Sequence, residues 1–395
     1  MMQGRSVIVS AVRTPIGAFQ GYLSSLSASD LASICIKDIL DQTGIQTNQI
    51  NEVILGNVLS AGQGQAPARQ ATLKSGCPDS VEALTINKMC GSGLKAVMLA
   101  DQAIRCGDAD LILAGGMESM SNAPYLLNDA RAGKKLGHSK VIDSIIHDGL
   151  WDAYNDKHMG NCAEMLANDR NYSREAQDEY AIESYNRAQQ ATSDGIFRTE
   201  IVPVVIPQRK GEPLVIDEDE EPAKARFEKI PALKPAFDKD GTITAANSSK
   251  LNDGAAVMLI TSEENAKDLG LKPLVRILEQ ASASHQPEWF TTAPSKAIGK
   301  VLNKAGLKAN DIDLWEINEA FAVVAMAAIE DYNIQYENVN IYGGAVALGH
   351  PIGASGARIL TTLINGMNRQ NVDRGLATLC IGGGEASALI VEKYD

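Results

Sequence analysis

Residues 83–105 read ALTINKMCGSGLKAVMLADQAIR, and this stretch decides the fold. Leu84 to Ile86 is typical of the end of a buried strand, and Cys90 to Gly93 of a tight turn. Apolar residues then recur at helical spacing from Leu94 to Ile104. A cysteine therefore stands at a strand-to-helix junction, where the free N–H groups and the dipole of the helix favour a thiolate. Most buried cysteines are inert small hydrophobes, so Cys90 taken alone fits a structural role better than a catalytic one.

Size and charge limit the classes of function. The 395 residues exceed one ordinary hydrophobic core, so we expect two or three domains. The formal net charge of −13 disfavours a nucleic-acid or anionic-membrane surface. Six scattered cysteines without a C-x-x-C pair indicate free thiols and no zinc site. No targeting leader, lipidation signal or membrane-spanning run is apparent, so we expect a cytoplasmic protein.

Strand and helix patterns alternate along the first third of the chain. Strands are expected at residues 6–10, 52–57 and 110–116, and helices at residues 31–40 and 67–74. Such alternation is typical of βαβ units. It predicts an α/β fold with a mainly parallel sheet.

A polar, irregular region follows, from residue 117 to about residue 249. It contains helical patterns at residues 162–171 and 173–193, with Ser173 as the expected N-cap of the second helix. We interpret it as an inserted domain. Residues 255–260 resume the buried-strand pattern and are expected to rejoin the first sheet.

The last third of the chain repeats the first. The matched segments are residues 52–57 with 313–318, residues 91–95 with 353–358, and residues 110–118 with 376–385. Three matches in the same order favour an internal duplication over a coincidence of common βα patterns. A duplicated α/β fold can bring strand ends from both halves to one crevice.

Four residues in the second half are candidates for chemistry. His350 precedes a proline that restrains its backbone, and an imidazole held there suits a base that deprotonates a thiol. Cys380 is followed by three glycines, and an N–H such as that of Gly382 can point at an oxyanion. Asn318 can hold a water. Each residue also has a simpler interpretation. His350 can be a surface histidine, the glycines after Cys380 can form only a tight turn, and Asn318 can cap a helix.

Together these residues resemble the thiolase family, and specifically its biosynthetic, acetoacetyl-CoA-forming branch. The resemblance covers nearly the whole chain. It is carried, in family order, by RTPIGAFQG, GQAPARQA, NKMCGSG, GGMESMSNAPY, HMG at residues 158–160, LNDGAA, NEAFA, GHPIGASG and CIGGG. It implies duplicated βαβ core domains in a five-layered αβαβα arrangement with an inserted loop domain. The implied domains are residues 1–118 with 250–272, residues 119–249, and residues 273–395.

The resemblance also implies a mechanism. His350 activates Cys90, whose thiolate takes the acetyl group of acetyl-CoA. Cys380 then removes a methyl proton from a second acetyl-CoA, and the enolate attacks the acetyl-cysteine to give acetoacetyl-CoA and CoA. His350 and a water held by Asn318 form one oxyanion hole, and the N–H groups of Cys90 and Gly382 form the other. No metal or redox cofactor is expected.

Ten further residues are implied to contact coenzyme A. They are Leu150, His158, Met159, Phe237, Ala245, Ser248, Ser249, Leu251, Ala320 and Phe321. The chain departs from the family pattern at several positions: Ala246 and Lys250 stand where glycines are usual, Phe290 is bulky, Ala386 follows the glycine turn, and Pro222 and Lys229 replace an Arg and a Ser. These departures affect the CoA loop and the acyl pocket.

Acetyl-CoA, acetoacetyl-CoA and CoA are therefore the expected small-molecule partners, in a homo-oligomer that is a dimer or a tetramer. Two alternatives stay open. One is a 3-ketoacyl-CoA thiolase of broader chain length, which the HMG and GHPIGASG stretches disfavour. The other is a catalytically silent acyl-CoA-binding relative, which the departures in the CoA loop allow.

Overall fold

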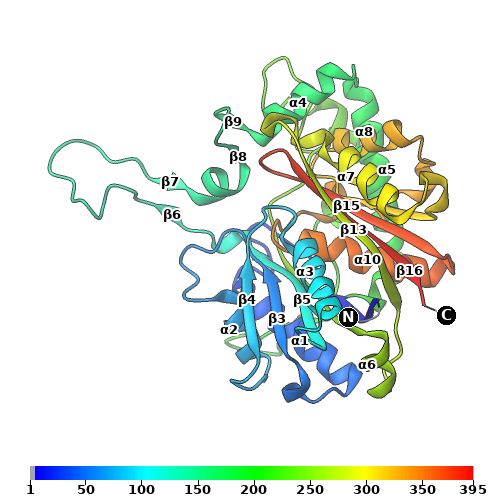
Figure 1. Cartoon of the computed structure of the whole chain (residues 1–395). Coiled ribbons are helices and arrows are strands. Elements are labelled where there is room, and N and C mark those ends of the chain that lie inside the picture. The colour runs from blue at the N-terminus through cyan, green and yellow to red at the C-terminus, as the bar shows by residue number, and fades with distance from the viewer. Residues whose placement is uncertain (1–4, 395) are drawn as a thin grey trace.

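The computed structural model describes residues 5–394, which fold around a 10-stranded mixed sheet (Figure 1). Residues 1–4 and 395, where we looked for targeting signals, lie outside the described residues. Across the sheet the strands are β14 (Leu314–Ile317), β15 (Arg374–Ile381), β16 (Glu385–Lys393), β13 (Val275–Ser284), β1 (Ser6–Arg13), β12 (Asn252–Ser262), β5 (Leu111–Ser119), β3 (Glu52–Gly56) and β4 (Glu82–Ile86), and β2 (Gly17–Ala18) pairs with β12.

The prediction of a mainly parallel sheet was wrong. Only β14 with β15, β3 with β5 and β3 with β4 pair in parallel, and the other neighbours are antiparallel. The parallel pairs come from the alternating βαβ segments. Among the antiparallel pairs, β15 and β16 are joined directly by the tight turn at Gly382, and the others bring together strands that are not consecutive in the chain.

The predicted duplication is visible in the strand order. β1 and β13 meet at the centre, with β12, β5 and β3 following on one side and β16, β15 and β14 on the other. The two halves therefore use equivalent strands in mirrored sequence. Residues 255–260 rejoin the first half as part of β12, between β1 and β5, as predicted.

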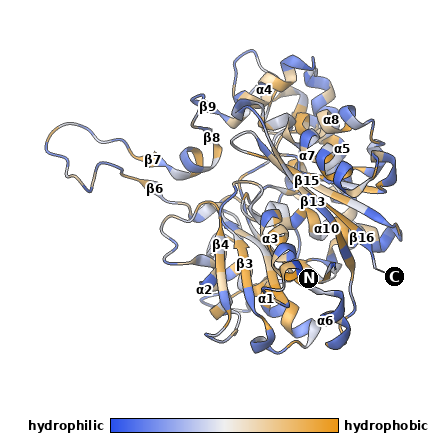
Figure 2. Cartoon of the chain, viewed as in Figure 1, coloured by the Kyte–Doolittle hydropathy of each residue, from blue (hydrophilic) through white to orange (hydrophobic). Residues whose placement is uncertain are grey.

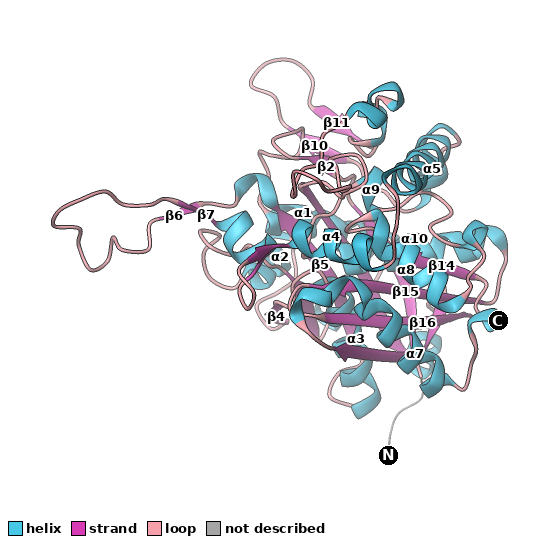
Figure 3. Ribbon diagram, turned by 90° about the horizontal axis from the view of Figure 1, so that it is seen from above, coloured by secondary structure: helices cyan, strands magenta, loops and turns pink. Residues whose placement is uncertain are grey.

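Helices and sheet form five layers, which three apolar clusters hold together. The outer helices α1 (Ala28–Thr43) and α2 (Pro67–Lys74) cover one half of the sheet. α3 (Ser92–Cys106) and α10 (Ser355–Gln370) pack between the halves, and α7 (Ala293–Ala305) and α8 (Ala322–Tyr332) cover the other half. Figure 3 shows helices around the strands from above, and Figure 2 shows the apolar residues concentrated in the strands. The five-layered α/β fold is confirmed.

Local sequence accounts for most helix boundaries. Ser27 and Asp30 form a capping box at the start of α1, and Gly44 ends it with φ = 68°. Ser173 caps α5 (Arg174–Ser193) by accepting the N–H of Ala176, as predicted. β4 differs from expectation, because it is the edge strand and Leu84 is 41% exposed rather than buried.

The region between β5 and β12 contains three small antiparallel pairs. They are β6 (Tyr125–Leu126) with β7 (Ile142–Asp143), β8 (Trp151–Asp152) with β9 (Lys157–His158), and β10 (Val204–Ile206) with β11 (Leu214–Ile216). The loop between β6 and β7 projects far from the body (Figure 1). α4 (Met159–Asp169) packs on α8, and α5 packs on α9 (Ala345–Leu348).

The short helix α6 (Glu263–Asp268) follows β12 and completes the α-helices of residues 5–394. None of the helices in this part of the chain combines the length and apolar character needed to cross a membrane.

Candidate active site

Cys90 lies in the sharp turn between β4 and α3. Met89, the residue before it, adopts φ = 47°, an uncommon value for a residue with a side chain. Ser92 braces the turn, because its hydroxyl accepts the N–H of Lys88 at 2.8 Å and donates to the carbonyl of Met89 at 2.7 Å. A side chain at Gly91 would collide with Ile381. The turn thus places the half-buried residue Cys90 directly before the first turn of α3.

The hydrogen bonds of His350 define which ring nitrogen can act as a base. Its Nδ1 lies 2.6 Å from Oγ of Ser355, and that hydroxyl donates its own proton to the carbonyl of Pro351 at 2.8 Å. Nδ1 must therefore carry the proton and donate it to Ser355, which leaves a lone pair on Nε2. Nε2 makes no hydrogen bond to the described residues. The nitrogen needed for proton transfer is free.

The backbone of His350 is also held. Its N–H donates to Oδ1 of Asn252 at 2.9 Å, and Nδ2 of Asn252 donates to the carbonyl of Gly17 at 3.0 Å. His350 is only 5% exposed. The imidazole is therefore fixed from both its ring and its backbone.

Cys380 and Asn318 lie at neighbouring strand ends. β14 and β15 are parallel with Ile317 opposite Thr378, and the N–H of Asn318 donates to the carbonyl of Thr378 at 3.0 Å. Both side chains are fully buried. Neither atom of the Asn318 amide has a partner among the described residues. An unpaired buried amide costs about 1–3 kcal/mol, so its retention points to a functional role.

The Gly382 turn brings a backbone donor to Cys90. Gly383 and Gly384 take φ values of 94° and 82°, which only glycine adopts easily. The N–H of Gly382 is oriented so that it lowers the pKa of the Cys90 thiol. This N–H is one of the two donors that the sequence predicted for an oxyanion.

Burial keeps the resting site neutral. It raises the pKa of Cys90 to about 11, raises that of Cys380 well above its usual value, and lowers that of His350 to about 3. The positive charge of Arg358 lowers the pKa of His350 further. A thiol that shares a cavity with an unprotonated imidazole can transfer its proton to the free Nε2 when the sulfur attacks.

Most of the predicted site residues line one cavity of about 320 Å³. Its walls include the predicted residues Cys90, Leu150, His158, Met159, Phe237, Ser248, Ser249, Leu251, Ala320, Phe321, His350 and Gly382. Asn318, Cys380 and Ala245 are not among the lining residues, and Ala245 is exposed. Cys380 is nevertheless close enough to Cys90 for the two thiols to influence each other's ionisation.

The cavity is lined by further residues that the sequence did not assign to substrate binding. They are Met120, Ile146, Gly149, Lys250, Phe290 and Ile352. Lys250 and Phe290 were noticed only as departures from the family pattern. Met120 and Ile352 resemble ordinary core residues, and only their place directly after the GGMES and GHP motifs could have indicated them. Ile146 and Gly149 carry no such signal.

The segment His158-Met159-Gly160 forms one wall for a clear physical reason. Nδ1 of His158 accepts the N–H of Gly160 at 3.0 Å and so caps α4, while the ring stacks on Phe237 with centroids 4.8 Å apart. A side chain at Gly160 would collide with the ring of Phe237. Met159 is then directed to the cavity.

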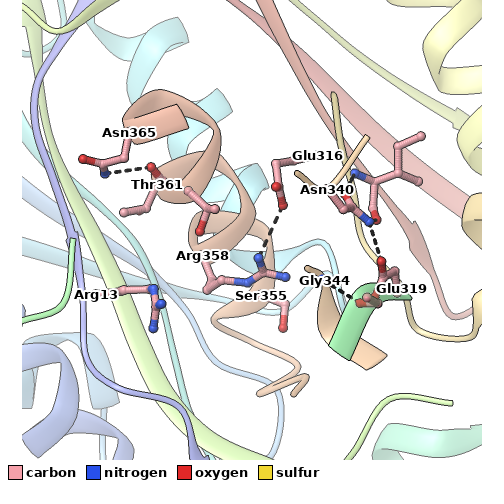
Figure 4. Close-up of polar contacts among 12 residues, drawn as sticks. Arg13, Glu316, Glu319, Asn340, Gly344, Ser355, Arg358, Thr361 and Asn365 are labelled. Atoms are coloured by element: carbon pink, nitrogen blue, oxygen red, sulfur yellow. Dashed lines mark hydrogen bonds and ion pairs between the residues drawn. The ribbon is translucent and has the colours of Figure 1, made fainter. Parts of the chain in front are cut away.

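A buried ion pair supports the site from behind. Arg358 on α10, one turn after Ser355, has its Nη1 3.4 Å from Oε2 of Glu316 on β14, two residues before Asn318 (Figure 4). Both charged side chains are nearly inaccessible. The pair connects the helix that orients His350 to the strand that precedes Asn318, and no sequence pattern indicated it.

Glu118 provides a second buried link that was missed. Its carboxylate accepts hydrogen bonds from Nδ2 of Asn57 at 2.8 Å, the N–H of Val58 at 3.0 Å and the N–H of Gly353 at 2.9 Å. Burial raises its pKa to about 7. Glu118 thereby ties the end of β3 to the loop that contains His350.

Comparison with known proteins agrees with this geometry. The thiolase N-terminal domain family matches residues 6–264, and the thiolase C-terminal domain family matches residues 271–393. The chain is 52% identical to an acetyl-CoA acetyltransferase of Pseudomonas aeruginosa, covering 98% of this chain and 99% of the relative. It is 51% identical to an acetyl-CoA acetyltransferase of Allochromatium vinosum, covering 99% and 100%.

Solved structures are equally similar. The crystal structure of the Bacillus anthracis acetyl-CoA acetyltransferase superposes with a TM-score of 0.97 at 40% identity, covering both chains completely. A thiolase of Ascaris suum in complex with coenzyme A gives a TM-score of 0.94 at 44% identity, covering 99% of this chain and 100% of the other. The chain belongs to the thiolase family.

Proposed function

We propose that the protein is an acetyl-CoA C-acetyltransferase that condenses two acetyl-CoA molecules to acetoacetyl-CoA and CoA, reversibly and through an acetyl group on Cys90. The observation that carries the proposal is the free Nε2 of His350 in the same cavity as the Cys90 thiol. The relatives named acetyl-CoA acetyltransferase support the same activity.

In the first half-reaction, Nε2 of His350 accepts the proton of Cys90, and the sulfur attacks the thioester carbonyl of acetyl-CoA. The N–H groups of Cys90 and Gly382 stabilise the oxyanion that forms. Collapse expels CoA, which leaves with the proton from His350. Each donor of such an oxyanion hole is worth about 3 kcal/mol of transition-state stabilisation.

In the second half-reaction, Cys380 gives its thiol proton to Nε2 of His350, and the resulting thiolate removes a methyl proton from a second acetyl-CoA. The enolate carbon then attacks the acetyl group on Cys90. Burial makes the Cys380 thiolate costly and therefore a strong base. The enolate oxygen is stabilised by His350, protonated at Nε2, and by a water on the unpaired amide of Asn318. Cys90 leaves as a thiolate and takes the proton from Nε2 of His350, so that both thiols and the neutral imidazole are restored.

Substrate binding and selectivity follow from the cavity walls. Its apolar lining, including Met159 and Phe321, suits the pantetheine arm of CoA. Phe290 is 2% exposed and limits the space for the acyl group, which favours acetyl over longer chains. A thiolase accepting longer 3-ketoacyl-CoA substrates is the second candidate. The proposed reaction requires no metal or redox cofactor.

The proposal also covers the oligomeric state and the cellular location of the protein. A homo-oligomer, dimer or tetramer, is supported by the exposed edge strand β4 and by exposed apolar residues of the projecting loop, such as Leu136, which is 94% exposed. A cytoplasmic location is supported by the six free cysteines, the state that a reducing compartment maintains.

Thiolysis of two substrates tests the proposal. Purified protein is supplied with CoA and either acetoacetyl-CoA or a 3-ketoacyl-CoA with a long acyl chain. We expect cleavage of acetoacetyl-CoA to exceed cleavage of the long-chain substrate by at least about tenfold in kcat/KM, because one misplaced methylene already changes discrimination by about 10- to 200-fold. Comparable values would favour the broader thiolase, and no cleavage of either would contradict both.

A further inference from the structure

The Lys250 side chain occupies a cage of oxygen atoms beside the cavity. Its Nζ lies 2.8 Å from the carbonyl of Val346, 3.3 Å from the carbonyl of Ser248 and within hydrogen-bonding distance of the hydroxyl of Tyr185. It also lies 5.0 Å from the centre of the Tyr185 ring. An ammonium group has three N–H donors, so these oxygens satisfy all of them.

The surroundings of this ammonium are negative but provide no direct ion pair. Glu221 and Glu319 are the carboxylates whose charge acts on Lys250. Glu319 already accepts hydrogen bonds from Tyr180, Ser184, Asn340 and the N–H of Val346, and Figure 4 shows its contact with Asn340. Burial nevertheless lowers the pKa of Lys250 to about 8, so the group is mostly charged at neutral pH.

The cage joins two segments that the reaction needs. Ser248, Ser249 and Leu251 line the cavity around Lys250. Val346 belongs to α9, which ends at Leu348, two residues before His350. Asn252, the first residue of β12, follows this segment and also contacts the His350 loop, because its Oδ1 accepts the N–H of His350.

We propose that the Lys250 ammonium holds the substrate-binding loop at residues 248–251 against α9. This contact positions the cavity wall formed by the loop relative to His350. Lys250 is a positioning residue for acyl-CoA binding. The inference rests on the proposed function, since it concerns the same cavity. Glycine is usual at this position of the family pattern, so the device belongs to this chain's own sequence.

Substitution of Lys250 separates this role from general stability. Lys250→Met keeps the length of the side chain and removes the charge, and Lys250→Gly empties the cage. Losing hydrogen bonds from a charged group costs about 1.5–3 kcal/mol, and a loss of that size in binding corresponds to roughly a 10- to 150-fold rise in KM for acetyl-CoA. We expect kcat to fall less than about threefold, because Cys90, His350 and Cys380 keep their own contacts.

Chemical rescue provides a readout that a merely structural residue does not give. We expect methylammonium to restore the KM of Lys250→Gly towards the wild-type value. Tetramethylammonium at the same ionic strength has no N–H donors and is expected to have no effect. Lys224→Met is the matched control, because Lys224 is 50% exposed and pairs with Glu220 outside the cavity.

The experiment measures KM and kcat by steady-state kinetics and the dissociation constant of CoA by calorimetry, using the full-length variants. Thermal unfolding checks that each variant is folded. Raised KM and CoA dissociation constant with methylammonium rescue support the inference. A KM and a CoA dissociation constant of wild-type size in Lys250→Met overturn the inference. So does a folded variant that loses only kcat, or a folded Lys250→Gly variant that methylammonium does not rescue. If Lys250→Met does not fold, rescue of Lys250→Gly decides. Failure of the wild type itself to form acetoacetyl-CoA would contradict the proposed function instead.

Discussion

Nδ1 of His350 donates to the hydroxyl of Ser355, whose own proton is committed to the carbonyl of Pro351. This relationship fixes the tautomer of the imidazole and leaves Nε2 free to accept the proton of Cys90. Since Ser355 opens α10, the central helix layer of the fold directly orients the imidazole that we propose as the base.

Replacing Ser355 by Ala should slow the acetylation of Cys90. The ring loses the acceptor that selects its tautomer, and a neutral hydrogen bond of about 1.5 kcal/mol corresponds to roughly a tenfold loss. Rapid-quench measurement of acetyl transfer from acetyl-CoA checks this. Thr361→Ala is a suitable control, because its hydroxyl bonds the carbonyl of Ala357 further along α10. Equal rates for the wild type and Ser355→Ala would disprove the orienting role.

Replacing Cys380 by Ala should separate the two half-reactions. We expect the variant to acetylate Cys90 at a rate within about threefold of the wild type, yet to lose condensation by at least about 100-fold, the lower end of what a general base contributes. Cys162→Ala is the matched control, because Cys162 is fully buried in the same apolar cluster. Normal condensation by Cys380→Ala would refute the assignment.

The free energy of unfolding should depend on pH through the buried side chains of Cys90 and His350. Cys90 has a folded pKa of about 11 against 9.0 for an unperturbed thiol, so its contribution is present below pH 9 and is lost between about pH 9 and 11. His350 has a folded pKa of about 3 against 6.5, so its contribution is present above pH 6.5 and is lost as the pH falls towards 3.

Urea unfolding across this range tests the expectation. We expect the difference in the free energy of unfolding between the wild type and Cys90→Ser to change above about pH 9, and that between the wild type and His350→Gln to change below about pH 6.5, because each difference isolates one titrating group. Cys90→Ser should weaken the alkaline decline and His350→Gln the acidic one. If both variants kept the slopes of the wild type, the burial of these groups would not control the pH dependence.

Shortening Phe290 should broaden the acyl specificity. Its ring is buried and lines the cavity, so Phe290→Leu opens space where a longer acyl chain would lie. We expect kcat/KM for a six-carbon 3-ketoacyl-CoA, relative to acetoacetyl-CoA, to rise about tenfold or more. Phe197→Leu, in a different apolar cluster, controls for general loosening. An unchanged ratio would show that Phe290 does not determine chain length.

The fold was predictable wherever the signal is local or repeated. Helix α2 begins and ends where its pattern predicts, and the match between Asn57 and Asn318 revealed the duplication. The direction of the strands was not predictable, because β1, β12, β13 and β16 pair with strands far away in the sequence. The exposure of Leu84 follows from the edge position of β4, which no local pattern specifies.

The site was predictable where residue types carry chemistry within motifs. Resemblance to a family identified Cys90 and His350, and both line the cavity. The supporting residues were not predictable, because their partners are remote: Arg358 pairs with Glu316 over 42 positions and Glu118 bonds Gly353 over 235. From the sequence alone, a charged residue such as Arg358 cannot be assigned to the buried contacts behind the site, because its partner is not known.

The most direct test of the central claim is the covalent state of Cys90. Wild-type protein is incubated with acetyl-CoA, quenched with acid and digested, and the peptide carrying Cys90 is weighed by mass spectrometry. The account predicts one acetyl group on this peptide, removed by added CoA and absent in Cys90→Ala. Acetoacetyl-CoA formation without any acetyl group on Cys90, or its appearance only on another cysteine, would contradict the account.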